Sequence, residues 1–204
     1  MSEKEQEVET MNKLTRDDLY SLEKYSEVRP EFRARVMAHK KNRRLPIGPN
    51  AALYFEDALT MHYQIQEMLR AERIFEASGI QEELDAYNPL IPDGSNWKAT
   101  FMMEYPDEDE RRVQLAKLIG IERHVWAQVA DFARITPVAD EDLERETEEK
   151  TSSVHFLRFE LTAEMVAAVK AGSPISIGID HPAYTYAAEP VAQNIRDSLA
   201  ADLT

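Results

Sequence analysis

Two histidines lie at the ends of apolar rows in the C-terminal half of the chain, where an imidazole could hold a ligand or move a proton. His155 shares one face of the predicted strand 154–161, and His181 follows the apolar face of the predicted strand 174–180. In a ferredoxin-like sheet of order 4-1-3-2 these ends share one edge, and the two rings would lie about 10 Å apart. The candidate ligand-binding residues at this edge are His155, Asp180, His181, Tyr184 and Trp97. Two interpretations stay open: structural histidines satisfied by loop groups, or a site for a small molecule or metal.

Metal chemistry has weak support in the sequence. A separation of about 10 Å is too long for one ion to bridge both rings unless loops bend inward. A set of helix-borne side chains invites a carboxylate-bridged di-iron interpretation: Glu56, His62, Glu67 and Glu72. The Glu-x-x-His pair that such sites use is absent. The metal and the cofactor are therefore unknown, and the absence of cysteine excludes a cofactor bound through cysteine.

Nucleophilic catalysis has no recognisable motif. Ser152, Ser153 and His155 are close in sequence, but no supporting acid or oxyanion donor can be assigned to them. Glycine-rich phosphate loops are absent. We therefore assign no catalytic residue, and we expect a protein that is not an enzyme, with an enzyme at the histidine edge as the alternative.

A basic strip follows the first helical segments. Residues 13–44 carry a net charge of +5 within a chain of 204 residues and net charge −14. Its candidate partner-binding or anion-binding side chains are Arg29, Arg33, Lys40, Lys41, Arg43 and Arg44. These cations could pair with an acidic helix of the same chain, bind a partner or anion, or bind nucleic acid. Nucleic acid is the least favoured, because the rest of the chain is acidic and no aromatic residues interleave the basic cluster.

Apolar periodicity predicts an α+β fold. Residues 1–12 are expected to be a mobile tail, 13–96 a helical region with a basic and an acidic helix, and 97–204 a sheet domain. The helices are predicted near 15–29, 30–44, 51–77, 107–118, 163–171 and 191–199, and the strands near 97–105, 124–133, 154–161 and 174–180. This order predicts an N-terminal helical hairpin followed by a ferredoxin-like β-α-β-β-α-β antiparallel sheet. The charged hairpin leaves room for a homodimer.

The cellular setting is predicted from what the sequence lacks. No apolar run is long enough to span a bilayer, and the first ten residues are acidic and polar, unlike a signal peptide. We expect a cytoplasmic protein that does not contact membranes.

Several sequence strings together resemble a bacterial family described only as domain of unknown function 3501. The resemblance covers about residues 13–190 and rests on LTRDDLYSLEKYSEVRPEFRARVMAHKKNRRLPIGPN, LYFED with QIQEMLRAERI, LDAYNPLIPDG with KATFMMEYPDEDERR, and HFLRF with IGIDHPAY. It implies a redox or iron-linked setting, near rubrerythrin-like and iron–sulfur oxidoreductase proteins, and supplies no catalytic residues. The expected function is thus an accessory or interaction protein for an iron–sulfur or rubrerythrin-type redox module. The alternative is a small-molecule- or metal-binding protein or enzyme that uses the His155/His181 edge.

Overall fold

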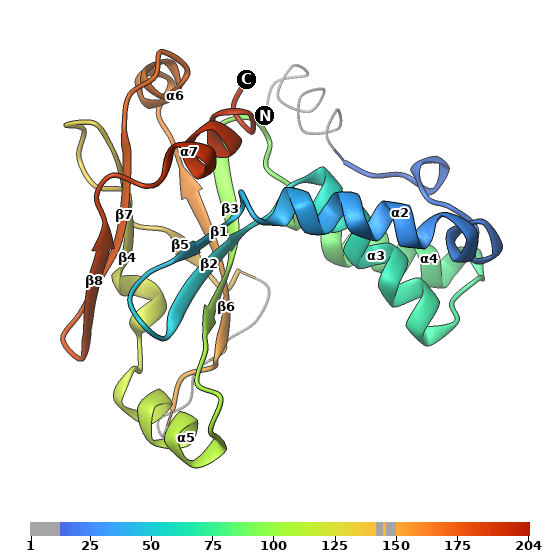
Figure 1. Cartoon of the computed structure of the whole chain (residues 1–204), viewed down its shortest axis with the longest axis horizontal. Helices are drawn as coiled ribbons and strands as arrows, with labels where there is room; N and C mark the ends of the chain where they lie inside the picture. The colour runs from blue at the N-terminus through green and yellow to red at the C-terminus, as the bar shows by residue number, and fades with distance from the viewer. Residues whose placement is uncertain (1–12, 142–144, 146–149) are drawn as a thin grey trace. The chain divides into compact units, whose positions relative to one another are not determined.

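The computed structural model describes residues 13–141, 145 and 150–204, and the predicted tail 1–12 lies outside them (Figure 1). The chain divides into two compact units. A helical unit contains residues 56–94 and the described residues up to Asn42, and a sheet unit contains residues 43–55 and 95–204. The division therefore does not follow one break near residue 96, because the chain enters the sheet unit, leaves it and returns.

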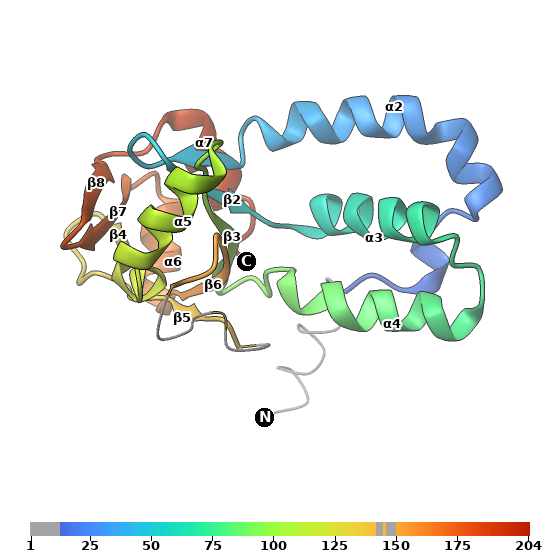
Figure 2. The ribbon, with the colours of Figure 1, turned by 90° about the horizontal axis from the view of Figure 1, so that it is seen from below.

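Three helices lie side by side in the helical unit, with α3 between α2 and α4 (Figure 2). Its elements are η1 (Arg16–Asp18), α2 (Leu22–Lys40), α3 (Ala58–Glu72), α4 (Ala77–Tyr87) and η2 (Asn88–Leu90). Side-chain caps define where the first two helices begin: Ser21 accepts a hydrogen bond from the backbone of Lys24, and Asp57 accepts one from Thr60. Arg73, in the left-handed region, ends α3.

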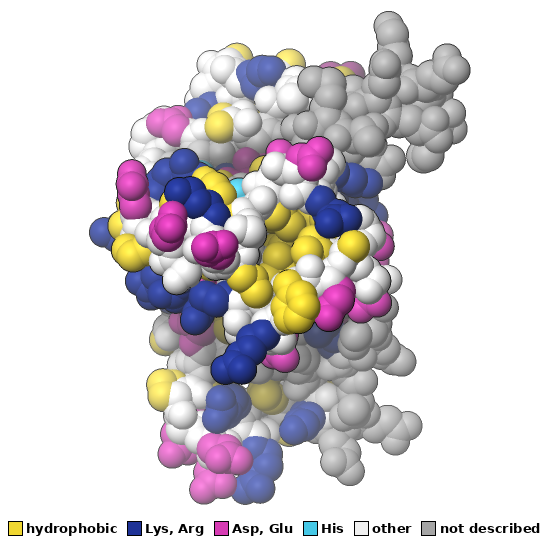
Figure 3. All heavy atoms as spheres, turned by 90° about the vertical axis from the view of Figure 1, so that its right-hand side faces the viewer, with side chains coloured by type: hydrophobic (Ala, Val, Ile, Leu, Met, Phe, Trp, Pro, Cys, Tyr) yellow, Lys and Arg dark blue, Asp and Glu magenta, His cyan; other side chains and the backbone are white. Residues whose placement is uncertain are grey.

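The surface of the helical unit retains hydrophobic side chains. Figure 3 shows them gathered on one face, with Lys and Arg side chains beside them. Among the described residues of this unit, the large exposed hydrophobic ones are Tyr20 and Phe75, and Phe75 is 71 % exposed.

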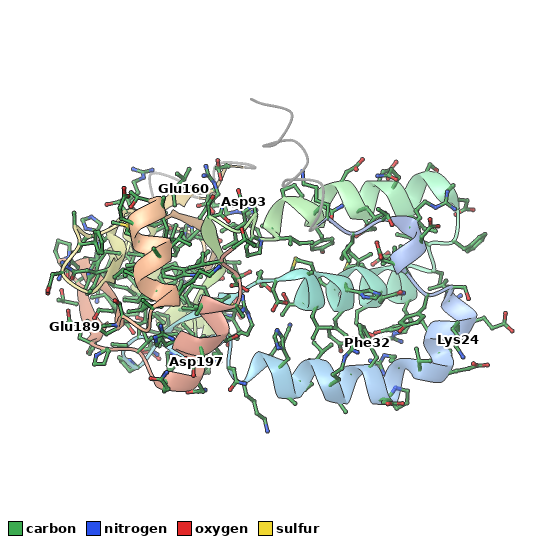
Figure 4. The ribbon with its side chains drawn as sticks, turned by 90° about the horizontal axis from the view of Figure 1, so that it is seen from above. Lys24, Phe32, Asp93, Glu160, Glu189 and Asp197 are labelled. Carbon is green, nitrogen blue, oxygen red and sulfur yellow. The ribbon has the colours of Figure 1, made fainter. Side chains whose placement is uncertain are left out.

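Aromatic rings fill the space between α2 and α3. Phe32 points from α2 toward α3, as Figure 4 shows, and its ring lies 5.0 Å from that of His62 and 6.1 Å from that of Tyr63. Tyr25 and Val36 are fully buried in the same cluster. The apolar stripe predicted for residues 30–44 is thus the face of α2 that packs against α3.

The helix α2 continues through Pro30, although the sequence predicts a break there. A proline inside a helix removes the hydrogen bond to the carbonyl four residues earlier, here that of Ser26. Pro30 and Ser26 are both exposed, so water can satisfy that carbonyl. The buried stripe on the opposite face holds the two halves in one helix.

The sheet unit contains two antiparallel sheets (Figure 1). The first has the order β1 (Arg44–Pro46), β2 (Ala51–Phe55), β3 (Asn96–Met103), β6 (Val154–Glu160) and β5 (Val138–Ala139). The second has the order β4 (Val125–Val129), β7 (Ile175–His181) and β8 (Tyr184–Ala188). The unit's other elements are α5 (Glu108–Lys117), η3 (Ile121–His124), α6 (Ala163–Lys170) and α7 (Gln193–Ala200).

The α+β class is confirmed, and the strand order differs from the ferredoxin-like order. The ferredoxin-like order would place β7 beside β3 and β4 beside β6. In the structure β2 pairs with β3 instead, and β7 pairs with β4 in a separate sheet. Residues 51–55, predicted as the beginning of a long helix, form β2, and α3 begins only at Ala58.

One hydrophobic core joins the two sheets. Its members come from every long strand, for example Leu53 of β2, Trp97 of β3, Val125 of β4, Phe159 of β6 and Ile177 of β7. Each such side chain, when fully buried, contributes about 1.5–3 kcal/mol to folding. Within the described residues, no helix has both the length and the apolar character needed to cross a bilayer.

Candidate functional site

His155 and His181 do not share a sheet edge, which corrects the expectation from the sequence. His155 lies on β6 in the five-stranded sheet, and His181 ends β7 in the three-stranded sheet. Trp97 is not beside His155 either: Trp97 pairs with Phe159, and His155 pairs with Phe101. Four residues along a strand separate these pairs by about 13 Å. The predicted edge site is therefore not assembled.

His181 is satisfied by backbone groups. Its Nε2–H donates to the carbonyl of Ile119 at 3.2 Å, and its Nδ1 accepts from the backbone N–H of Ala183 at 3.1 Å. These partners fix a neutral tautomer, and burial lowers the pKa of the ring. His181 therefore has the structural role that the sequence left open.

Asp180 and Tyr184 serve other contacts. Asp180 is exposed and pairs with Arg134. The Tyr184 hydroxyl donates to the carbonyl of Ile47 at 2.8 Å and accepts from the backbone N–H of Asn50 at 2.9 Å. Burial raises the pKa of Tyr184 to about 12. Trp97 is fully buried, and its indole N–H donates to the carbonyl of Leu199.

The predicted basic strip separates into paired and exposed cations. Arg29 forms a bidentate pair with Glu67 in the helical unit, at 2.7 and 2.9 Å. Lys40 lies over the ring of Tyr63. Arg33 on α2 and Lys41, the residue directly after α2, are exposed.

Two cations of the strip belong to the sheet unit. Arg44 pairs with Glu104 at 2.8 Å. Arg43 is 2 % exposed and pairs with Asp202 at 2.7 Å, so its side chain is not on the surface, where a partner or anion would have to meet it. Arg29 therefore pairs with the predicted acidic helix, whereas the partners of Arg43 and Arg44 lie outside that helix.

A network that the sequence did not reveal surrounds His155. The ring is fully buried, and its Nδ1 lies 2.6 Å from Oδ2 of Asp140. Its Nε2 lies 3.0 Å from Oγ1 of Thr151 and 3.1 Å from the carbonyl oxygen of Ser152. Asp140 follows β5 with a positive φ of 50°, and its Oδ1 accepts from the backbone N–H of Phe156. Asp140 therefore fixes the ring and the start of β6 together.

A second buried carboxylate faces the other side of the ring. Oε2 of Glu122 lies 3.9 Å from Nε2 of His155 and has no hydrogen-bond partner among the described residues. Arg123 pairs with Oε1 of Glu122 at 3.2 Å, and Arg145 pairs with Asp140 at 3.3 Å. Buried charges are normally paired, and the buried Glu122 has the largely exposed Arg123 as its partner, whereas Asp140 and Arg145 are both partly buried.

A cleft of about 520 Å³ adjoins this network. We call it the α5 cleft, because one face of α5 forms one wall and the segment before β6 forms the other. It is lined by Glu108, Arg111, Arg112, Leu115, Arg145, Lys150, Thr151, Ser152 and Ser153. The four residues from α5 have the i, i+3, i+4, i+7 spacing of a single helix face. Among the described residues, four cations, one carboxylate and three hydroxyl groups therefore line the same space.

This chemistry suits an anion. Guanidinium and ammonium groups form charge-assisted hydrogen bonds with phosphate and carboxylate oxygens, and hydroxyl groups add neutral donors. Metal binding has no comparable support: no group of three or more His, Cys, Asp or Glu side chains within the described ranges is placed to hold an ion. Of the predicted di-iron set, Glu67 is bonded to Arg29 and Tyr25, and Glu56 accepts from the Thr60 hydroxyl.

The comparisons with known proteins agree with the resemblance seen in the sequence. The family model described as "Protein of unknown function (DUF3501)" matches residues 13–203. The chain belongs to this family. No curated protein matches it.

A protein of known structure shares the fold. The crystal structure described as a novel protein of unknown function from Burkholderia pseudomallei K96243 has 56% sequence identity and a TM-score of 0.88. The match covers 94% of this chain and 99% of the other. Family membership thus supports the architecture, and the function has to be argued from the α5 cleft and its neighbours.

The sequence contains one signal for this cleft. Two adjacent arginines lie on one face of the predicted helix 107–118, which is formed by Glu108, Arg111, Arg112 and Leu115. Its periodicity alone predicts only a helix between two strands. Asp140 and Glu122 carry no such signal, because each stands among other charged residues and contacts His155 only through the fold.

Proposed function

We propose that this chain is a binding protein for a small ligand with two or more negative charges, held in the α5 cleft by phosphate or carboxylate groups. The observation that carries the proposal is the concentration of four cations among the described residues of one cleft, in a chain of net charge −14. Such a gathering gives the described lining of the cleft a local charge opposite in sign to that of the whole chain. Two of its cations also have partners within the chain, since Arg112 pairs with Asp109 at 2.9 Å and Arg145 pairs with Asp140 at 3.3 Å.

The other lining residues narrow the ligand class. Leu115 is the apolar member, and the described lining includes no aromatic ring on which a base could stack. The hydroxyl groups of Thr151, Ser152 and Ser153 favour a ligand with many oxygen atoms. A sugar phosphate or a polycarboxylate fits these features better than a nucleotide does.

The test is calorimetric titration of the purified full-length chain with inorganic phosphate, sulfate, citrate and a sugar bisphosphate at low salt. Arg111→Gln removes a charged donor from the wall, and Lys117→Gln removes a cation from α5 that is outside the cleft lining. A hydrogen bond from a charged group contributes about 1.5–3 kcal/mol, so we expect roughly a tenfold or larger loss of affinity for Arg111→Gln and little change for Lys117→Gln. Equal effects of the two variants, or no heat with any probe, would contradict the proposal.

A second candidate function is the accessory role for an iron–sulfur or rubrerythrin-type redox protein. Two features of the helical unit favour it: Arg33 on α2 and Lys41, directly after α2, are exposed, and Phe75 is a large exposed hydrophobic side chain. The chain has no cysteine, so a redox centre bound through thiolates would have to belong to the partner.

This role is tested with purified rubrerythrin-type and iron–sulfur proteins from the same organism, by measuring binding at low and high salt. Charge reversal in Arg33→Glu/Lys41→Glu is compared with reversal of two exposed lysines of the sheet unit, Lys117→Glu/Lys170→Glu. Salt-sensitive binding that only the first pair abolishes supports the accessory role. Absence of binding, or equal loss with both pairs, contradicts it.

A further inference from the structure

Within the described residues, the two sheets of the sheet unit end in four edge strands, and three of these are protected against pairing with another chain. An edge strand presents unpaired backbone N–H and C=O groups, and charge, proline, short length or a covering segment prevents other strands from meeting them. β1 has three residues, with Arg44 and Pro46 among them, and β5 has two. β4 is covered, because Ala127 exchanges backbone hydrogen bonds with Ile135 at 3.0 and 2.7 Å.

β8 is the fourth edge, and it has none of these protections. Its five residues, YTYAA, include no charge and no proline, and they pair one to one with β7, without a bulge. Tyrosine and threonine, which occupy its first three positions, favour strands. Figure 1 shows β8 as the outermost strand of the three-stranded sheet. β8 therefore presents an open and uncharged edge.

The turn before β8 determines which of its backbone groups point outward. Only two residues separate the paired His181 and Tyr184, so this closing pair has to be one that exchanges both of its hydrogen bonds. Exchanging and non-exchanging pairs alternate along an antiparallel ladder. The N–H and C=O groups of Thr185 and Ala187 therefore point away from β7, toward the free edge.

The side chains of β8 suit an uncharged contact. Tyr186 is 46 % exposed, although its ring lies 4.8 Å from that of Tyr184 between centroids. Thr185 and Ala187, on the other face of the strand, are also exposed. The whole chain has a net charge of −14, so two copies repel each other overall. An uncharged edge keeps this repulsion small at the point of contact.

We propose that β8 is a dimerisation edge, at which it pairs antiparallel with β8 of a second copy of this chain. Antiparallel pairing of a strand with itself has a two-fold axis, the commonest symmetry of homo-oligomers, and each free N–H then meets a free C=O of the same segment. The register that uses both outward-facing residues sets Thr185 opposite Ala187 of the second copy, and Ala187 opposite its Thr185. Both pairs are of the kind that exchanges two hydrogen bonds.

This register brings tyrosine to the axis and keeps like charges apart. Tyr186 lies opposite Tyr186 of the second copy in a non-hydrogen-bonded pair, where facing side chains come closest and aromatic pairs stabilise a sheet. Glu189, the first charged residue after β8, lies opposite Ala183 of the second copy and not opposite another carboxylate. The two three-stranded sheets become one continuous sheet, and neither copy keeps an open β8 edge.

The experiment measures the mass of the full-length chain by sedimentation equilibrium over a range of concentrations. We expect a mass that rises from 23.4 kDa toward twice that value. Tyr186→Lys and Tyr186→Glu each set two like charges opposite one another, so each variant alone should dimerise roughly tenfold or more weakly. An equimolar mixture of the two should recover the dimer, because residue 186 then meets an opposite charge across the axis. Val138→Lys is the matched control: Val138 is 42 % exposed on the edge strand β5, and its replacement should leave the dimer unchanged.

Two further measurements keep the test decisive if the substitutions at residue 186 disturb the fold. Ala187→Pro removes an outward N–H and no hydrogen bond to β7, so it should prevent dimerisation while the tryptophan emission stays that of the wild type. In the wild-type chain, the amide hydrogens of Thr185 and Ala187 should exchange more slowly as the concentration rises. A mass of 23.4 kDa at every concentration overturns the proposal. So does a dimer that keeps its affinity in Tyr186→Lys or in Ala187→Pro, a mixture of the two residue-186 variants that stays monomeric, or exchange at these amides that does not change with concentration.

Discussion

Replacing Arg43 by methionine should strongly destabilise the sheet unit. The guanidinium of Arg43 donates to both carboxylate oxygens of Asp202, at 3.0 and 2.7 Å, and also to the carbonyls of Phe55 and Ser198. The side chains of Arg43 and Asp202 are only 2 % and 8 % exposed. Arg43→Met leaves a buried carboxylate without its counter-charge, and breaking a buried pair in this way costs about 3–5 kcal/mol.

The assay is urea unfolding followed by tryptophan fluorescence. Both tryptophans of the chain, Trp97 and Trp126, belong to the sheet unit, so their emission reports the unit that contains the pair. With a urea dependence of about 1–3 kcal/mol per molar, the expected loss lowers the midpoint by roughly 1 M or more. Arg44→Met is the matched control, because Arg44 is 42 % exposed and its pair with Glu104 contributes at most about 1 kcal/mol.

The double variant Arg43→Met/Asp202→Leu separates the pair from the packing around it. Removing both charges from a buried pair is often close to neutral, so the double variant should regain much of the stability lost in Arg43→Met. A loss below about 1 kcal/mol in Arg43→Met, equal to that of Arg44→Met, would refute the reasoning and return Arg43 to the set of surface cations.

Three further predictions concern other parts of the structure. The Arg29 guanidinium lowers the pKa of Glu67 from 4.5 to about 2, so the stabilisation from this pair is complete above pH 4.5 and is lost as the pH falls toward 2; Glu67→Gln should weaken this part of the acid dependence of the far-ultraviolet circular dichroism. Tyr184→Phe leaves a buried carbonyl and N–H without the hydroxyl and should cost about 1–3 kcal/mol in the same fluorescence assay. Gly178→Ala places a Cβ 2.4 Å from the Trp126 ring, and thermal unfolding should show a loss of about 1–3 kcal/mol; unchanged profiles would contradict each argument.

The elements that sequence predicts well are those with a clear period. Residues of β3 alternate between buried and half-buried along Trp97–Met103, and β6 alternates in the same way. By contrast, β2 is buried at four of its five positions, so its sequence AALYF has no strand period and reads as the beginning of the helix that follows it. Because β2 occupies the place beside β3, this one short segment changes the order of the whole sheet.

Sequence periodicity also fails to distinguish the two histidines of the predicted site. His155 and His181 have the same pattern in the sequence, each at the end of an apolar row, and both are buried. His181 donates to one backbone group and accepts from another, whereas His155 meets the carboxylates of Asp140 and Glu122, the Thr151 hydroxyl and the Ser152 carbonyl. Periodicity determines which face of a strand a side chain occupies, and the chemistry of that side chain depends on what the fold places opposite it. For His155 the two carboxylate partners come from η3 and from the turn after β5, so the polar surroundings of the ring are a property of the tertiary structure.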